Sequence, residues 1–262
     1  MAKIMYSSLQ MREIFHLEFL RWMARKVKAE RYALKGGANL RFFFNSFRYS
    51  EDMDLDVFSV RVDMLKDIVM QILSNQSFQD MLKPFGIGRL VNPDMAKAKQ
   101  TETTQRFKVH LITTAGEDLF TKVEFSRRSR NEGKSIVEPV SDTISRLYKL
   151  PPLLMPHYNI ESAIIQKIRA LSDRTVLQAR DIFDLYVLSS QYKPVKTGEA
   201  KIDNERLAKA REGILEIGFE QFRDTVVSYL SFEDQAVYNN SSSWGEIKLK
   251  ALNFIDEYTR VY

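Results

Sequence analysis

The stretch KGGANLRFFFNSFRYSEDMDLD, residues 35–56, joins a glycine pair to three closely spaced aspartates. Asp52, Asp54 and Asp56 alternate with apolar residues, the pattern of a β-strand with one polar and one apolar face. Carboxylates on one face repel each other, so their pKa values rise unless a cation neutralises them. Such oxygen ligands suit Mg²⁺ or Mn²⁺. The aspartates alone, however, also fit a charged outer face that protects an edge strand from pairing.

The glycine pair upstream of the acidic strand suggests a phosphate ligand. Gly36 and Gly37 follow Lys35 and precede a helix-like run, so their backbone N–H groups could approach a phosphate at a helix N-terminus. A glycine pair alone is more often a tight turn. A calcium-binding loop is excluded, because it needs glycine at its sixth position and glutamate at its twelfth, where Val57 and Asp63 stand.

A second acidic strand is predicted at LFTKVEF, residues 119–125. Lys122 and Glu124 share the face opposite Val123 in this alternating pattern. Glu124 would supply a third carboxylate to a metal site if this strand lay beside the first. By itself, the pattern describes an ordinary half-exposed strand.

Composition sets wider limits on the class of protein. The 262 residues carry 44% hydrophobic and 28% charged side chains, which is typical of a folded domain. With no cysteine, disulfides and zinc–thiolate sites are excluded, and the composition fits a reducing cytosol. The sequence shows no signal peptide and no apolar run near the ~20 residues that span a bilayer, so we expect a cytoplasmic protein without membrane contact. The net charge of +5 slightly favours a nucleic-acid or phosphate-rich partner.

Periodicity predicts the elements around these motifs. Helical spacing predicts helices over 8–30, 38–46, 61–83, 159–190, 203–230 and 244–262, and alternation predicts strands over 31–34, 53–60, 106–114 and 119–125. Polar stretches over 91–105 and 126–139 are predicted loops. Prolines at 151, 152 and 156 mark a boundary. We therefore predict an α+β fold, in which a mixed-sheet domain with flanking helices, residues 1–150, precedes an all-helical domain, residues 151–262.

The order of these motifs resembles that of the polymerase-β-like nucleotidyltransferase superfamily. More narrowly, Lys35-Gly36-Gly37-Ala38 through Arg48-Tyr49-Ser50-Glu51-Asp52-Met53-Asp54-Leu55 resembles the first motif of the AbiEii/AbiGii toxin family. The resemblance continues at Lys122-Val123-Glu124, and then at Lys167, Ala170-Leu171, Arg174 and Arg180-Asp181-Ile182-Phe183-Asp184-Leu185. Two departures occur: Ala38 replaces the family's threonine, and Glu124 stands where many relatives carry aspartate.

The resemblance implies roles for individual residues. Asp52, Asp54 and Glu124 would be the catalytic residues and would bind Mg²⁺ or Mn²⁺. Nucleotide binding would fall to a larger group: Lys35, Gly36, Gly37, Ser50, Lys122, Lys167, Arg174, Asp181 and Asp184. For Asp181 and Asp184 a structural ion-pair network is an equally good interpretation, and Asp56 is better explained as structural. The histidines at positions 16, 110 and 157 are not in metal-binding spacing and are expected to be surface or core residues.

The resemblance also implies an activity. The protein would be a Mg²⁺-dependent nucleotidyltransferase toxin or phage-defence protein that moves an NMP from an NTP to RNA, with the tRNA 3′ end as first candidate. The helical domain would close the active-site cleft, and a cognate antitoxin would be the partner. Transfer to a protein side chain and a non-catalytic NTP-binding regulatory module are the alternatives. A basic loop at Arg127, Arg128, Arg130 and Lys134 is where a nucleic acid could be steered.

Overall fold

The computed structural model describes residues 5–95, 98–127, 133–192 and 202–261, which form two compact units. The first unit contains the chain up to Phe43 together with Tyr49–Tyr158. The second contains the short segment Phe44–Arg48 and residues Asn159–Tyr262. The chain therefore leaves the first unit for five residues, just before the acidic strand, and then returns to it.

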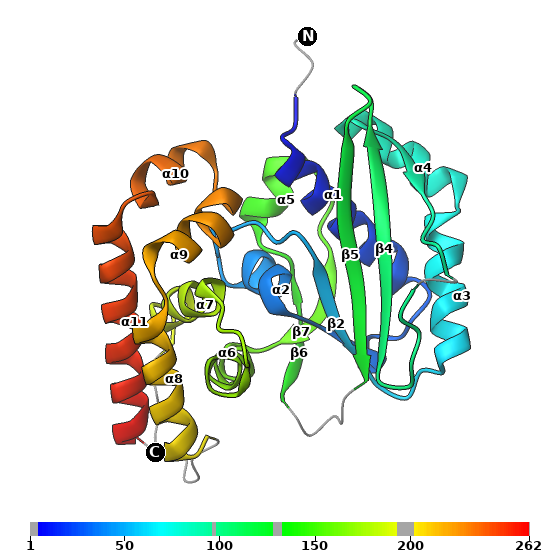
Figure 1. The fold of residues 1–262 in the computed structure, drawn as a ribbon. Helices are drawn as coiled ribbons and strands as arrows, with labels where there is room; N and C mark the ends of the chain where they lie inside the picture. The colour runs from blue at the N-terminus through cyan, green and yellow to red at the C-terminus, as the bar shows by residue number, and fades with distance from the viewer. Residues whose placement is uncertain (1–4, 96–97, 128–132, 193–201, 262) are drawn as a thin grey trace. The chain divides into compact units, whose positions relative to one another are not determined.

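A seven-stranded mixed sheet forms the centre of the first unit (Figure 1). The strands are β1 (Tyr32–Lys35), β2 (Met53–Val57), β3 (Ile87–Val91), β4 (Thr104–Thr113), β5 (Asp118–Arg127), β6 (Ser135–Pro139) and β7 (Leu154–Tyr158). Their order is β3-β4-β5-β2-β1-β7-β6. β2 runs parallel to β5 and β1 parallel to β7, while the other neighbours are antiparallel. The acidic strand β2 is thus a central strand, so protection of a sheet edge does not explain its aspartates.

Helices cover the sheet because each buries an apolar face against it. The helices of the first unit are α1 (Ser8–Ala24), α2 (Gly36–Phe43), α3 (Val62–Leu73), α4 (Gln76–Leu82) and α5 (Asp142–Tyr148), with 3₁₀ turns at Ala29–Arg31 and Lys83–Phe85. α1, α3 and α4 lie on one side of β4 and β5 (Figure 1). α1 begins at a capping box, in which Ser7 and Gln10 satisfy each other's backbone N–H groups. Its residues Ile14, Phe15 and Phe19 are fully buried in the core.

The second unit contains the remaining helices of the described chain. They are α6 (Ile160–Asp173), α7 (Ala179–Ser189), α8 (Asn204–Glu216), α9 (Phe219–Thr225), α10 (Phe232–Tyr238) and α11 (Ser241–Val261), with a 3₁₀ turn at Val227–Tyr229. α6 packs against α7 and α8, and α11 packs against α7 and α8. Among the described helices, none has the length and apolar character that crossing a membrane would require.

The structure corrects several expectations from the sequence. The helix predicted over 61–83 is two helices, because Asn75 caps the start of α4 with its side chain. The predicted loop over 126–139 contains strand β6, and the predicted first helix ends at Ala24. Strand β7 pairs with β1 and β6, so the sheet-bearing unit continues to Tyr158, past the boundary expected at residue 150. Arg128 and Arg130 of the predicted basic loop lie outside the described residues.

Candidate active site

Three charged side chains meet at one level of the sheet, on strands β1, β2 and β5. Asp54 is paired in register with Lys35 of β1 and with Glu124 of β5. Adjacent strands lie about 4.8 Å apart, so the side chains of the three residues are direct neighbours on one face. Glu124 therefore lies beside Asp54, as the sequence predicted it would if the two acidic strands were adjacent.

Asp54 is held in a strongly desolvated position at this level of the sheet. Burial raises its pKa above the ordinary value of 3.8. The nearby Lys35 and Lys122 act in the opposite direction, and Glu124 and Asp52 raise the pKa further. The structure thus holds a desolvated carboxylate beside two others. A divalent cation would relieve this repulsion.

Gly36 begins helix α2 directly against the Asp54 carboxylate. Its φ is +66°, a conformation that favours glycine, and a Cβ built there would lie 3.0 Å from Asp54 Oδ2. Only a residue without a side chain lets the helix start this close to the acid. Gly36 and Gly37 are the first two residues of the helix, so their N–H groups lack intrahelical partners and the positive end of the helix dipole lies here.

The other two predicted catalytic carboxylates are bonded to basic side chains. Lys122 Nζ lies 2.9 Å from Asp52 Oδ2, and Arg106 Nε donates to Glu124 Oε2 at 2.6 Å. Within the described residues, no three His, Cys, Asp or Glu side chains are gathered as a formed metal site. The donor atoms are nevertheless the hard oxygens that Mg²⁺ prefers, in adjacent positions. They fit a divalent cation in chemistry and in register, with Lys122 and Arg106 as their present counter-ions.

Asp56 has a different environment from the other acids. It is 3% exposed, receives Lys35 Nζ at 2.5 Å, and accepts a hydrogen bond from the Tyr158 hydroxyl at 2.7 Å. Asn39 of α2 donates to the Tyr158 carbonyl at 3.0 Å. This network joins β1, β2, β7 and α2, which agrees with the structural role expected for Asp56. It also fixes Lys35, whose nucleotide-binding role stays a prediction.

A buried chain of hydrogen bonds supports the turn that carries Asp52. Thr121 Oγ1 donates to the Glu51 carbonyl at 2.7 Å, and Ser50 Oγ donates to the Asp52 carbonyl at 2.7 Å. His16 Nε2 of α1 lies 2.7 Å from Thr121 Oγ1. Because the Thr121 hydrogen is used on Glu51, His16 Nε2 must be the donor to Thr121. Burial, then the charge of Arg12, lowers the pKa of His16 to about 3, so the ring is neutral.

These supporting residues were missed or only partly understood from the sequence. His16 was expected to be an ordinary surface or core residue, and it is indeed buried. Thr121, Arg106 and Tyr158 carried no signal, because each acts through a partner on another element. Only the register of the strands shows which residues they meet.

The predicted residues of the helical half gather in a separate cluster within the second unit. Lys167 Nζ of α6 lies 3.0 Å from Asp181 Oδ1 and 2.7 Å from Asp184 Oδ2, both on α7. Arg174 pairs with Asp181 at 2.6 Å. Arg48 donates to both carboxylate oxygens of Asp184, at 3.0 and 3.1 Å. The sequence indicated an ion-pair network at Asp181 and Asp184 and did not foresee that Lys167 and Arg48 are part of it. The nucleotide-binding role of Lys167, Arg174, Asp181 and Asp184 stays a prediction.

The electrostatics of this cluster favour the charged forms of Lys167 and Asp184 despite their burial. Burial alone would lower the pKa of Lys167, but Asp184 and Asp181 raise it overall. Burial alone would raise the pKa of Asp184, but Arg48 and Lys167 lower it overall. The Arg174 side chain is 40% exposed, in contrast to the buried Lys167, Asp181 and Asp184. Arg174 is therefore the member that can reach a ligand in solution.

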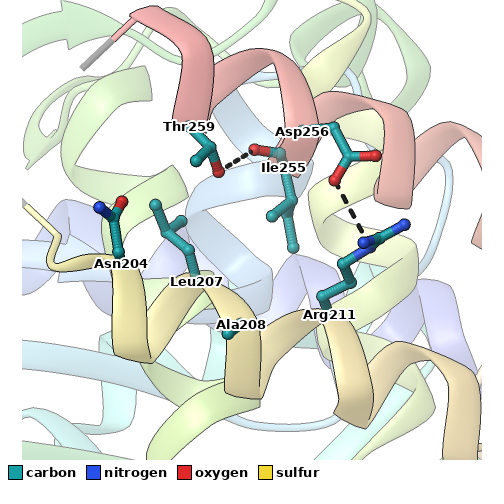
Figure 2. A pocket seen from close by; sticks show the side chains of 7 residues that line it. All are labelled: Asn204, Leu207, Ala208, Arg211, Ile255, Asp256 and Thr259. Carbon is teal, nitrogen blue, oxygen red and sulfur yellow. Dashed lines mark hydrogen bonds and ion pairs between the residues drawn. The ribbon is translucent and has the colours of Figure 1, made fainter.

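Two hollows in the described chain contain none of the predicted site residues. One, of about 420 Å³, lies between α8 and α11 and is bordered by Leu207, Arg211 and Asp256 (Figure 2). An Arg211–Asp256 ion pair of 3.4 Å crosses it. The other, of about 570 Å³, lies at the start of α3 beside Arg61 and Lys66. The predicted site residues thus lie outside both hollows, on strands β1, β2 and β5 and in the α6–α7 cluster.

Comparison with known proteins gives a consistent result. The family described as "Nucleotidyl transferase AbiEii toxin, Type IV TA system" matches residues 18–239. The structure is similar to that of JHP933 from Helicobacter pylori, with 19% identity, a TM-score of 0.56, and coverage of 98% of this chain and 94% of that one. It is also similar to MenT4, a nucleotidyltransferase toxin from Mycobacterium tuberculosis H37Rv, with 16% identity, a TM-score of 0.58, and coverage of 97% and 87%. No curated protein matches in sequence.

Proposed function

Because this chain belongs to the AbiEii family of nucleotidyltransferase toxins, we propose that it transfers an NMP from an NTP to the 3′ end of an RNA, with tRNA as the first candidate. One observation carries the proposal: Lys35, Asp54 and Glu124 stand in register, with the glycine-led start of α2 against Asp54. This arrangement offers N–H donors to phosphate on one side of Asp54 and a carboxylate to the acceptor on the other.

We propose Mg²⁺, or Mn²⁺, as the cofactor, held by Asp52, Asp54 and Glu124. When bound, divalent cations would neutralise triphosphate charge and polarise the reacting phosphate. Their charge would replace that of Lys122 on Asp52 and of Arg106 on Glu124. Both basic side chains are partly exposed, at 28% and 37%, so they can turn away from the acids without a large loss of packing.

The protein's own residues would then bind and orient the reactants. The N–H groups of Gly36 and Gly37 would bind the β- and γ-phosphates. Glu124 would accept the proton of the attacking 3′-hydroxyl. As the hydroxyl oxygen bonds to the α-phosphorus, the bond to the bridging oxygen breaks and pyrophosphate leaves. Lys122, predicted from the sequence to bind the nucleotide, would on release from Asp52 pair with a phosphate of the RNA acceptor.

The helical half would contribute through its ion-pair cluster. Lys167, Asp181 and Asp184 are buried and would hold Arg174 in place, while the exposed guanidinium of Arg174 would pair with phosphate. An all-helical domain that closes over the nucleotide remains part of this proposal. As a member of a toxin–antitoxin family, the chain would act on a cytoplasmic substrate and be restrained by a cognate antitoxin.

The test is a transfer assay with labelled nucleotides. The native chain and an Asp52→Ala/Asp54→Ala variant would be incubated with Mg²⁺, each α-labelled NTP in turn, and total tRNA or cell lysate. We expect label on RNA with the native chain only, and no label in EDTA. If the label appears on a protein band instead, the acceptor is a protein and not RNA. Absence of transfer to any acceptor, with NTP binding intact, would contradict the enzyme proposal and favour a non-catalytic NTP-binding module.

A further inference from the structure

The open face of strands β4 and β5 carries a strip of basic and aromatic side chains that leads away from the carboxylates. The two strands are antiparallel, and Arg106 lies opposite Glu124, Lys108 opposite Lys122, and His110 opposite Phe120. All three pairs have partly or fully exposed side chains, whereas the intervening residues are buried. α1, α3 and α4 lie on the other side of these strands (Figure 1).

The basic half of the strip is costly for the sheet on its own. Like charges directly opposite each other on one face of an antiparallel pair are destabilising, and Lys108 and Lys122 are such a pair. Arg106 lies one pair further along the same face. If a divalent cation takes over Asp52 and Glu124, Lys122 and Arg106 lose their counter-ions and three cations become available together. An anionic chain along the strip would remove this repulsion.

The aromatic half of the strip supplies a surface for a base. Phe120 is 58% exposed and stacks on His110, with ring centroids 4.6 Å apart and planes 21° apart. His110 is fixed in turn by Asp118, whose Oδ1 lies 2.6 Å from its Nε2, and the Phe120 carbonyl accepts from Arg12 at 2.8 Å. The ring pair is thus held in place before any ligand arrives. A single exposed phenylalanine would need no explanation, but this one continues the row of cations.

We propose that this strip, formed by Arg106, Lys108, His110, Phe120 and Lys122, binds the single-stranded 3′ end of the RNA acceptor. The inference rests on the proposed function and specifies where its acceptor lies. Phe120 precedes Glu124 by four residues of β5, about 13 Å at 3.3 Å per residue. The terminal hydroxyl would meet Glu124, the preceding phosphates would pair with the lysines and Arg106, and an unpaired base would stack on Phe120. A protein acceptor could use the cations but would not require the stacked rings.

The experiment measures RNA binding separately from transfer. A short fluorescein-labelled single-stranded RNA would be titrated with the full native chain, by fluorescence anisotropy, in Mg²⁺ at several salt concentrations and without NTP, so that no transfer can occur. Phe120→Ala should weaken binding about 5- to 150-fold with an unchanged salt slope. Lys108→Gln should reduce the slope of log K against log salt by about 0.7, the value for one phosphate contact. Phe120→Leu separates stacking from apolar contact and should bind nearly as weakly as Phe120→Ala.

Matched controls lie on the second unit. Phe232→Ala removes another exposed phenylalanine, 84% exposed on α10, and Lys209→Gln removes an exposed lysine of α8. Neither should change RNA affinity. If the native chain transfers label to RNA but Phe120→Ala and Lys108→Gln bind RNA as tightly as the native chain, the strip is not the RNA-binding surface. The proposed function would still stand. Binding that falls in both variants would support the strip even if transfer itself is not observed.

Discussion

Among single residues, Asp54 carries the sharpest conflict between folding and the proposed chemistry. Burial raises the pKa of Asp54, so the folded state favours the protonated acid. The stability that this provides is present at low pH and is lost as the pH rises from 3.8 through the raised pKa. Towards neutral pH, Asp54 therefore destabilises the fold. This is the expected cost of a charged site that awaits a cation.

Asp54→Asn should consequently raise the stability of the protein at pH 7 and abolish its activity. We expect transfer to fall at least about 100-fold, since several kcal/mol of charge stabilisation are lost. Urea unfolding at pH 7 and pH 4 should show a smaller stability gain at pH 4, where the native acid is closer to neutral. Asp80→Asn, at an exposed acid whose pKa is lowered by Lys83 and Gln76, should give no gain. A variant less stable than the native protein at pH 7 would contradict this account.

The sequence was most informative at the scale of residues where chemistry and backbone conformation coincide. Asp54, Glu124 and Gly36 could be selected because charge alternation and paired glycines leave a local pattern. Arg106 and Tyr158 could not, because each is defined by a partner far away in the chain. Such pairs depend on strand order and register, which no local pattern contains.

Between elements, the contact of α1 with β5 supports the turn that presents Asp52. His16 donates to Thr121, which donates to the Glu51 carbonyl. The folded pKa of His16 lies near 3, below its ordinary 6.5, so stability is lost as the pH falls below 6.5 and the unfolded chain takes up a proton. His16 is thus a positioning residue, and it ties the carboxylate turn to the core.

His16→Gln, which retains an N–H donor, should remove this pH dependence and keep most activity. Between pH 6.5 and pH 3, the unfolding free energy of the native protein should fall as the pH is lowered. Its slope should exceed the slope of the variant by up to about 1.4 kcal/mol per pH unit. His16→Leu leaves the buried Thr121 hydroxyl without its donor and should lower kcat about 10-fold at saturating NTP. Equal kcat in the Gln and Leu variants would show that the hydrogen bond does not position the site.

At this same scale, alternation in β4 and β5 and helical spacing in α1 predicted elements that the structure confirms. β6 escaped prediction because all but one of its five residues are exposed, so its sequence SIVEP has no buried face to reveal. β7 has the opposite problem, since Pro156 interrupts a short run that is buried on both faces. The break in the helix predicted over 61–83 depends on one cap, Asn75, inside a nearly continuous apolar pattern.

For the molecule as a whole, the buried ion pairs of the second unit concentrate stability in a few contacts. The Arg48 and Asp184 side chains are 6% and 0% exposed, and the Arg48 guanidinium donates hydrogen bonds to both oxygens of the Asp184 carboxylate. Removing one partner of a buried pair leaves an uncompensated charge, which costs about 3–5 kcal/mol. This is a large share of the 5–15 kcal/mol that holds a typical domain folded.

Arg48→Ala should therefore destabilise the protein by about 3–5 kcal/mol, measured by urea unfolding at pH 7. Adding Asp184→Asn to this variant should destabilise it further, because the buried Lys167 then loses one of its two carboxylate partners. Arg61→Ala, at a surface pair with Asp63, is the matched control and should leave the stability essentially unchanged, because exposed ion pairs contribute little. A loss of under 1 kcal/mol in Arg48→Ala would show that Lys167 alone satisfies Asp184.

The five-residue segment Phe44–Arg48 limits how the protein can be divided into fragments that fold on their own. Phe47 packs edge-on against Phe183 of α7, and the Phe44 carbonyl accepts from Gln191. If the chain were cut after Tyr158, residues 44–48 would stay with the N-terminal fragment. The helices of the second unit would then lose these contacts and expose Phe183 and Asp184. Because residues 44–48 belong to the helical unit, we expect a helical fragment to fold only when these residues are fused to it or supplied in trans as a peptide.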